Sequence, residues 1–190
     1  FADLQYLCQG FSESELSDDG VRSVKEEGVQ KNDPFIKLMV RTEGISSTSD
    51  PEGALRTKNQ ILQTIFAYKD PLLLNDFGMR GNTIQIDSKL YFFLEGKSHP
   101  FFSDEGLILR ASWRLAACEL RGDCSGANED VLMACITAAH CSRSLTDLIR
   151  DELMLAGDKD GQWFQRAVMY ARQIVDAIRR GDLQAFRPPA

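Results

Sequence analysis

The sequence predicts a mostly helical α+β fold, with a C-terminal four-helix bundle and a small β-hairpin or sheet in the N-terminal half. Helix-periodic segments with capping residues follow one another after residue 103, and one pair of strand-like runs flanks Asp87-Ser88. At 190 residues, 43% of them hydrophobic, the chain can bury a core. We expect a single domain over residues 1–190, or a division into a mixed α/β part (1–102) and a helical part (103–190).

The N-terminal segments carry weak signals. Residues 2–10 are predicted to form a short helix, and Gly28 is expected to interrupt any helix within the acidic segment 12–33. Strand and helix are nearly equal alternatives for the apolar run that follows Pro34.

The next two elements are better defined. Asp50 and Pro51 predict the start of a helix that runs to about Tyr68. Residues 82–86 and 89–94 predict the β-hairpin, and the second run is apolar on both faces in part. Because two strands alone are marginal, the hairpin must pack on helices or gain a third strand, for which residues 35–41 are the candidate.

From residue 103 onward the pattern is helical. Ser103, Asn128 and Ser144 are predicted N-caps of three helices. A fourth opens at Asp160 and ends at Gly181, and Asp182 caps a last turn.

Four of the five cysteines repeat one spacing, and each second member lies just past a predicted helix end. The pairs are Cys118 with Cys124 and Cys135 with Cys141. A chain that turns back at a helix end can bring such residues within disulfide distance, so this is the favoured of three connectivities. A zinc site and reduced, buried cysteines are the alternatives.

The stretch from Leu115 to Cys124, the Cys135–Cys141 segment and residues 174–182 together resemble the C-terminal part of uncharacterised exported proteins of Gram-negative bacteria. The resemblance covers about residues 103–186 and implies export, but no activity. Disulfides also favour a periplasmic or secreted protein. We expect that a signal segment preceded Phe1.

Composition argues against two classes of partner. The balance is acidic, with 28 Asp and Glu against 22 Lys and Arg, so we expect no nucleic-acid partner. No apolar run is long enough for a membrane span.

Most catalytic and cofactor motifs are missing. Gly96-Lys97-Ser98 lacks the glycine five positions earlier that a phosphate loop needs, and a turn with an N-cap explains Asp158 and Asp160 better than a calcium loop does. We therefore predict no cofactor and no metal. One hypothesis of nucleophilic catalysis is still open. Cys8 would be the nucleophile, His99 or His140 the base, and an acid such as Asp104 would orient the imidazole. A second hydrolase hypothesis is a pair of carboxylates from Glu105, Glu119 and Glu129.

Aromatic residues crowd the hairpin and its exit. The candidate binding residues are Tyr91, Phe93, Phe101 and Trp113, with Phe92 and Phe102 beside them; the alternative is a hydrophobic core. The sequence thus favours a non-catalytic, exported module that binds another protein or a cell-envelope component. A secreted hydrolase or toxin-like effector and a zinc-binding interaction domain are the alternatives.

Overall fold

The computed structural model describes residues 14, 17–33, 36–37, 40, 51–68, 74–75 and 83–188. The chain divides into two compact units, Phe1–Arg41 and Thr42–Ala190. The fold is α+β and mostly α, as predicted. The domain layout with a division at 102/103 stays a prediction, and the expected helix over residues 2–10, with Cys8, lies outside the described residues.

The first unit contains α2 (Asp18–Gln30), which begins after Ser17. The Ser17 hydroxyl accepts a hydrogen bond from the Gly20 amide at 3.1 Å. The helix continues through Gly28, so the expected interruption was wrong. A Cβ at position 28 would lie 2.6 Å from Ile36 Cγ1, so glycine leaves room for that side chain.

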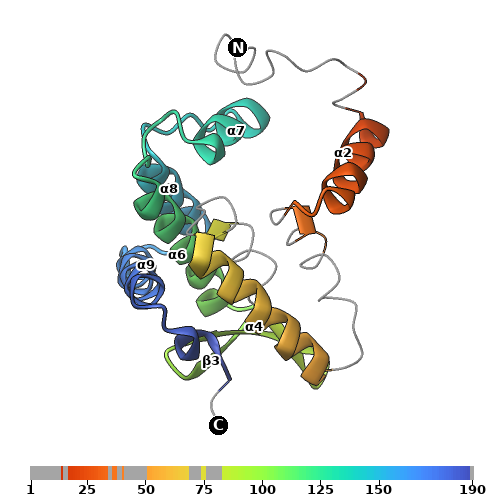
Figure 1. Cartoon of the computed structure of the whole chain (residues 1–190). Helices are drawn as coiled ribbons and strands as arrows, with labels where there is room; N and C mark the ends of the chain where they lie inside the picture. The colour runs from red at the N-terminus through yellow and green to blue at the C-terminus, as the bar shows by residue number, and fades with distance from the viewer. Residues whose placement is uncertain are drawn as a thin grey trace. The chain divides into compact units, whose positions relative to one another are not determined.

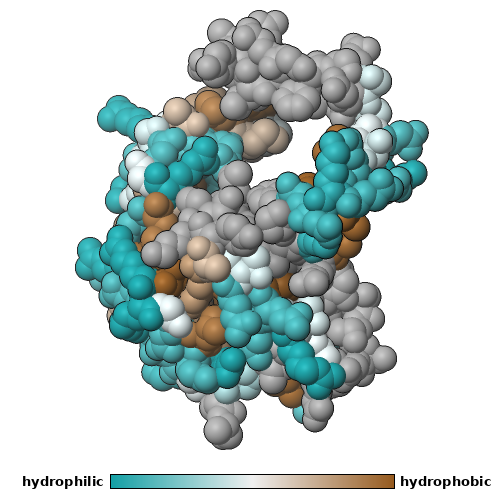
Figure 2. Space-filling view, in the orientation of Figure 1, coloured by the Kyte–Doolittle hydropathy of each residue, from teal (hydrophilic) through white to brown (hydrophobic). Residues whose placement is uncertain are grey.

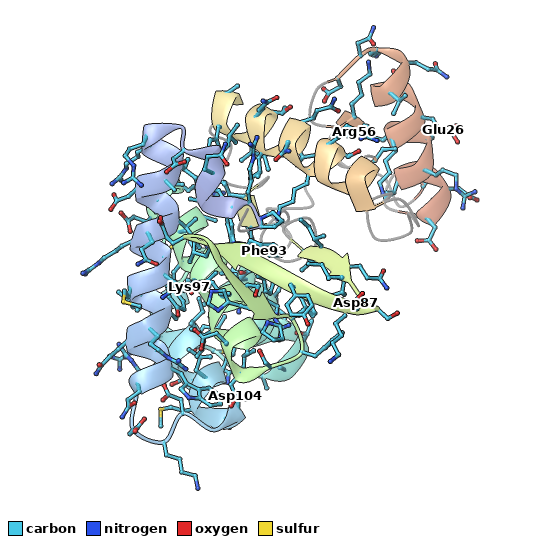
Figure 3. All side chains as sticks on the ribbon, turned by 90° about the horizontal axis from the view of Figure 1, so that it is seen from below. Glu26, Arg56, Asp87, Phe93, Lys97 and Asp104 are labelled. Atoms are coloured by element: carbon cyan, nitrogen blue, oxygen red, sulfur yellow. A yellow bond between two sulfur atoms is a disulfide. The ribbon has the colours of Figure 1, made fainter. Side chains whose placement is uncertain are left out.

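The sheet is antiparallel, in the order β1 (Thr83–Ile86), β2 (Lys89–Leu94) and β3 (Lys97–Pro100). The third strand is therefore residues 97–100, and Ile36, Lys37 and Val40 of the proposed strand are helical. Both turns have two central residues of positive φ, Asp87-Ser88 and Glu95-Gly96. Such tight turns match the twist of paired strands. They lie at opposite ends of the sheet, near Asp87 and Lys97 in Figure 3.

The buried end of β2 is covered on both faces, as expected. On one face Phe93 meets α4 (Pro51–Tyr68), where Lys58 Nζ lies 5.2 Å from the centre of its ring. On the other, Phe92 pairs with His99, which faces Glu105 of α6 (Asp104–Arg121). In Figure 3 the sheet accordingly lies between α4 and α6.

Helix α6 is the centre of the helical part (Figure 1). It packs mainly along α9 (Gln162–Arg180) and also contacts α8 (Leu145–Ala156), which α7 (Glu129–Ala138) adjoins. The short 3-10 helix η2 (Leu183–Phe186) brings Phe186 against Trp113 of α6, with ring centres 5.2 Å apart. None of the described helices is both long and apolar enough to cross a membrane.

The helix starts follow the sequence signals. Ser103, Asn128 and Ser144 each accept a hydrogen bond from an amide in the first turn, which confirms them as N-caps. The start of α9 is stabilised by two aspartates that precede the helix in sequence. Buried Asp158 accepts from the Trp163 and Phe164 amides at 3.0 and 2.9 Å, and Asp160 accepts from the Gln162 amide. Both aspartates thus act at the helix start, as the turn-and-cap interpretation expected, but the N-cap is Gly161 and α9 begins at Gln162 rather than at Asp160.

Candidate functional site

Two disulfides brace the helical part. Cys118 is joined to Cys124 and Cys135 to Cys141, with Cα atoms 5.1 and 4.2 Å apart. This is the connectivity that the spacing favoured. Because all four sulfurs are oxidised, they cannot act as thiolate ligands, and the zinc-binding alternative built on them is incompatible with the structure. The described residues contain no other group of His, Cys, Asp and Glu that could hold a metal ion.

Apolar side chains reach the surface where β3 leads into α6. We call this surface the aromatic corner; its members are Leu90, Tyr91, Pro100, Phe101 and Phe102. Phe102 is 84% exposed, the most exposed large hydrophobic side chain of the described residues. Exposed aromatic residues of this kind are typical of protein-binding surfaces rather than of cores.

A row of three rings connects Phe102 to the core. Buried Phe92 lies 5.2 Å from Phe101, and Phe101 lies 4.9 Å from Phe102 in an edge-to-face arrangement. The Arg110 guanidinium lies 4.7 Å from the Phe101 ring centre and donates a hydrogen bond to the Phe101 carbonyl. The exposed ring therefore stands on a well-packed support.

The backbone at this corner is equally constrained. The Ser103 hydroxyl donates to the Pro100 carbonyl at 2.6 Å and accepts from the Gly106 amide. A Cβ on Gly106 would lie only 2.2 Å from the Phe101 carbonyl oxygen, so this close approach requires glycine. A rigid aromatic loses little entropy on binding, which favours affinity.

A hollow of about 550 Å³ adjoins Phe102. Its lining consists of Gln85, Ser88, Lys89, Leu90, Tyr91, Pro100 and Phe102. Among these, Lys89 carries the one formal charge, and the rest offer apolar surface with three neutral polar groups, on Gln85, Ser88 and Tyr91. The hollow thus suits an apolar side chain that stands next to a carboxylate.

The predicted aromatic set divides between core and surface. Phe93 and Trp113 are each 1% exposed, so neither can contact a partner directly in this structure. Tyr91 and Phe101 are half-buried members of the aromatic corner. Alternation along β2 places Tyr91 and Phe92 on opposite faces of the sheet. Residues 101–103 follow β3 and have no such alternating pattern, so the sequence did not indicate that Phe102 is more exposed than Phe101.

His99 belongs to a polar cluster between β3, α6 and α9. Its Nδ1 lies 3.9 Å from Glu105 Oε1, so the acid beside His99 is Glu105 rather than the expected Asp104. Tyr170 donates a hydrogen bond to the same carboxylate, and Arg166 pairs with its other oxygen at 2.8 Å. Tyr170 and Arg166 come from α9, more than sixty positions away in sequence, and no local signal indicated them.

Burial governs the chemistry of this cluster. It lowers the pKa of His99, an effect that Glu105 opposes and Lys97 reinforces. Burial and the hydrogen bond to Glu105 raise the pKa of Tyr170 to about 12. Both side chains are therefore neutral near pH 7. The arrangement ties the sheet to α9, and His99 is buried rather than open to a substrate.

The remaining catalytic candidates lie elsewhere. His140 Nε2 lies 3.1 Å from Asp151 Oδ2, next to the second disulfide. Glu119 pairs with Arg179 and Glu129 with Arg121, as Glu105 does with Arg166, so each candidate carboxylate has its own arginine. The hypothesis that Cys8 attacks a substrate lies outside the described residues and stays a prediction.

Comparison with known proteins returned no match, whether to family models, to curated proteins or to solved structures.

Proposed function

We propose that this protein is a non-catalytic module of an oxidising compartment, periplasmic or extracellular, that binds another protein through the aromatic corner. The exposure of Phe102 on its packed support is the observation that carries this proposal. A phenylalanine that is 84% exposed is not itself part of the hydrophobic core. Aromatic side chains of this kind dominate the binding energy of protein interfaces.

The compartment part of the proposal rests on the disulfides. Two bridges span helix ends within one helical region. Disulfides persist in oxidising compartments and are rare where glutathione and thioredoxin keep thiols reduced.

The expected partner is a peptide segment with an apolar anchor residue beside Asp or Glu. The anchor would enter the hollow next to Phe102, and the carboxylate would lie near Lys89, the charged residue of its lining. This pairing supplies contact area from the rings and orientation from the charge.

Selection from a phage-displayed library of random dodecapeptides tests the proposal. Enriched peptides should combine Leu, Phe, Met or Trp with a neighbouring acid, and Phe102→Ala should weaken their binding roughly tenfold or more. Lys89→Glu should weaken it by roughly threefold or more. The matched control is Leu155→Ala, because Leu155 is 81% exposed but belongs to α8.

No enrichment, or binding that Phe102→Ala and Leu155→Ala reduce equally, would overturn the assignment of the binding surface. Thermal unfolding of each variant shows whether a loss of binding reflects a loss of fold, and truncation of an exposed side chain should leave stability nearly unchanged.

A further inference from the structure

The two disulfides share one spacing but lie in different surroundings. Cys118 is 4% exposed on the buried side of α6, and Cys124 is half-buried. Cys141 is exposed, and its partner Cys135 is half-buried on α7, a helix whose only buried residue is Val131. Access to the sulfur atoms therefore differs between the bridges.

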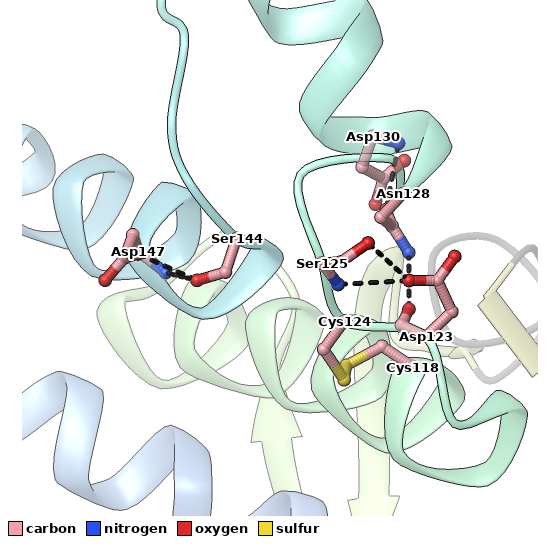
Figure 4. The surroundings of a disulfide bond; sticks show 8 residues. All are labelled: Cys118, Asp123, Cys124, Ser125, Asn128, Asp130, Ser144 and Asp147. Atoms are coloured by element: carbon pink, nitrogen blue, oxygen red, sulfur yellow. Dashed lines mark hydrogen bonds between the residues drawn. A yellow bond between two sulfur atoms is a disulfide. The ribbon is translucent and has the colours of Figure 1, made fainter.

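A hydrogen-bond network lies beside the first bridge, in the loop that carries Cys124 (Figure 4). The Asp123 carboxylate accepts from the amide and the hydroxyl of Ser125, and Asn128 donates to the Asp123 carbonyl. The Cys124 carbonyl accepts from the Leu145 amide at 3.0 Å, which ties this loop to α8. These bonds hold the loop that carries Cys124 in place.

The second bridge borders an open hollow of about 550 Å³. Its lining comprises His140, Cys141, Ser142, Arg143, Asp147 and Asp151. Figure 2 shows apolar surface over α7 beside it, where Met133 and Ile136 are exposed. Cys141 is exposed and lines this hollow, whereas Cys118 of the first bridge is buried.

The residues that line this hollow carry charges of both signs, Arg143 against Asp147 and Asp151. Arg143 is permanently charged. The opposing carboxylates are already engaged, Asp147 with the Ser144 hydroxyl and Arg150, and Asp151 with His140. A nearby cation favours the thiolate form, which is the reactive species in disulfide exchange.

Ser142 adds a second, independent observation. Its hydroxyl oxygen is buried and has no hydrogen-bond partner among the described residues, and Ser142 is one of the residues that line the same hollow. Buried hydroxyl groups without partners are rare and costly. A hydrogen bond to a thiolate would satisfy this one.

We propose that Cys135–Cys141 is an exchangeable disulfide whose substrates are dithiols, whereas Cys118–Cys124 is structural. A thiolate of the dithiol attacks Cys141 Sγ, the S–S bond breaks, and Cys135 leaves as a thiolate that takes up a proton. The second thiolate of the reagent then attacks its own sulfur in the mixed disulfide and releases Cys141. The dithiol becomes a disulfide, and its two protons and two electrons end on Cys135 and Cys141.

Timed reduction with dithiothreitol at pH 7.5 tests this proposal, in a Cys8→Ser background that removes the fifth thiol. Samples are quenched with iodoacetamide, and peptide mass spectrometry locates the alkylated cysteines. Cys135 and Cys141 should become alkylated roughly tenfold faster than Cys118 and Cys124, or more, because the first bridge must open locally before it reacts. Equal rates, or faster reduction of the first bridge, would overturn the assignment.

Two variants separate the local chemistry from simple exposure. Arg143→Gln and Ser142→Ala should each slow reduction of the second bridge by roughly twofold to tenfold while leaving the first unchanged. Arg179→Gln is the matched control, because Arg179 is a surface arginine paired with Glu119 on α6. If neither Arg143→Gln nor Ser142→Ala changes the rate, the charge and hydroxyl have no part in the exchange, and the proposal of a built site is wrong.

Discussion

Lys58 offers the sharpest test of the packing between α4 and the sheet. Its side chain is fully buried, with Nζ 5.2 Å from the centre of the Phe93 ring, and burial lowers its pKa from 10.5 to about 7. The folded chain therefore binds this proton less tightly than the unfolded chain does. Between these two pKa values, the free energy of unfolding rises with pH, and this contribution is lost as pH falls toward 7.

The size of the effect follows from the two pKa values. Between about pH 6 and about pH 9, Lys58 should increase the free energy of unfolding by roughly 2.5 kcal/mol. Lys58→Met keeps the length of the side chain and removes its titration. The variant should lack this part of the pH dependence.

Urea unfolding, followed by circular dichroism at several pH values, measures the pH dependence of both chains. Lys159→Met is the matched control, because Lys159 is exposed in the loop before α9. If Lys58→Met and the parent chain show parallel pH profiles, Lys58 is not buried as a titrating group, and the described packing of α4 on β2 is wrong.

Three further substitutions test the caps, the polar cluster and the aromatic corner. Asp158→Ala should lower the free energy of unfolding in urea by about 2 kcal/mol, since two α9 amides lose their acceptor, while Asp160→Ala should cost less than about 1 kcal/mol. The lowered pKa of His99 makes the folded chain lose stability as pH falls below the unfolded value near 6.5, so His99→Gln should flatten the stability profile between about pH 5 and 7. Gly106→Ala should destabilise the fold by roughly 3 kcal/mol in thermal unfolding, because the added Cβ meets the Phe101 carbonyl; an unchanged melting temperature would contradict the geometry of the corner.

Local chemistry made part of this fold predictable from sequence. The N-caps Ser103, Asn128 and Ser144 act within their own first turns, so short patterns suffice to find them. The same holds for the Asp87-Ser88 turn and for the cysteine pairs, whose partners are six positions apart.

Two expectations were wrong, each for a different physical reason. Gly28 weakens a helix in isolation, yet here its missing side chain admits Ile36. The third strand is only four residues long and ends in His99-Pro100, a pair with little strand preference, so hydrophobic patterning alone favoured residues 35–41.

The candidate sites depended on contacts that no local pattern contains. Tyr170 donates a hydrogen bond to Glu105, 65 positions away, and Phe102 is 84% exposed whereas its neighbour Phe101 packs on buried Phe92. Burial separated Phe93 and Trp113 from Tyr91 and Phe101, although all four residues had the same chemical argument in their favour.

The disulfide framework, the proposed compartment and the exchange reaction all depend on the oxidised state of the four paired cysteines. The decisive measurement is the intact mass of the chain, isolated from a periplasmic or secreted preparation and alkylated in denaturant with and without reductant. Without reductant we expect one alkylated cysteine among the five, and a peptide map that joins 118 to 124 and 135 to 141. Five alkylated cysteines in the unreduced chain would contradict the disulfide framework and, with it, the proposed compartment and the exchange reaction.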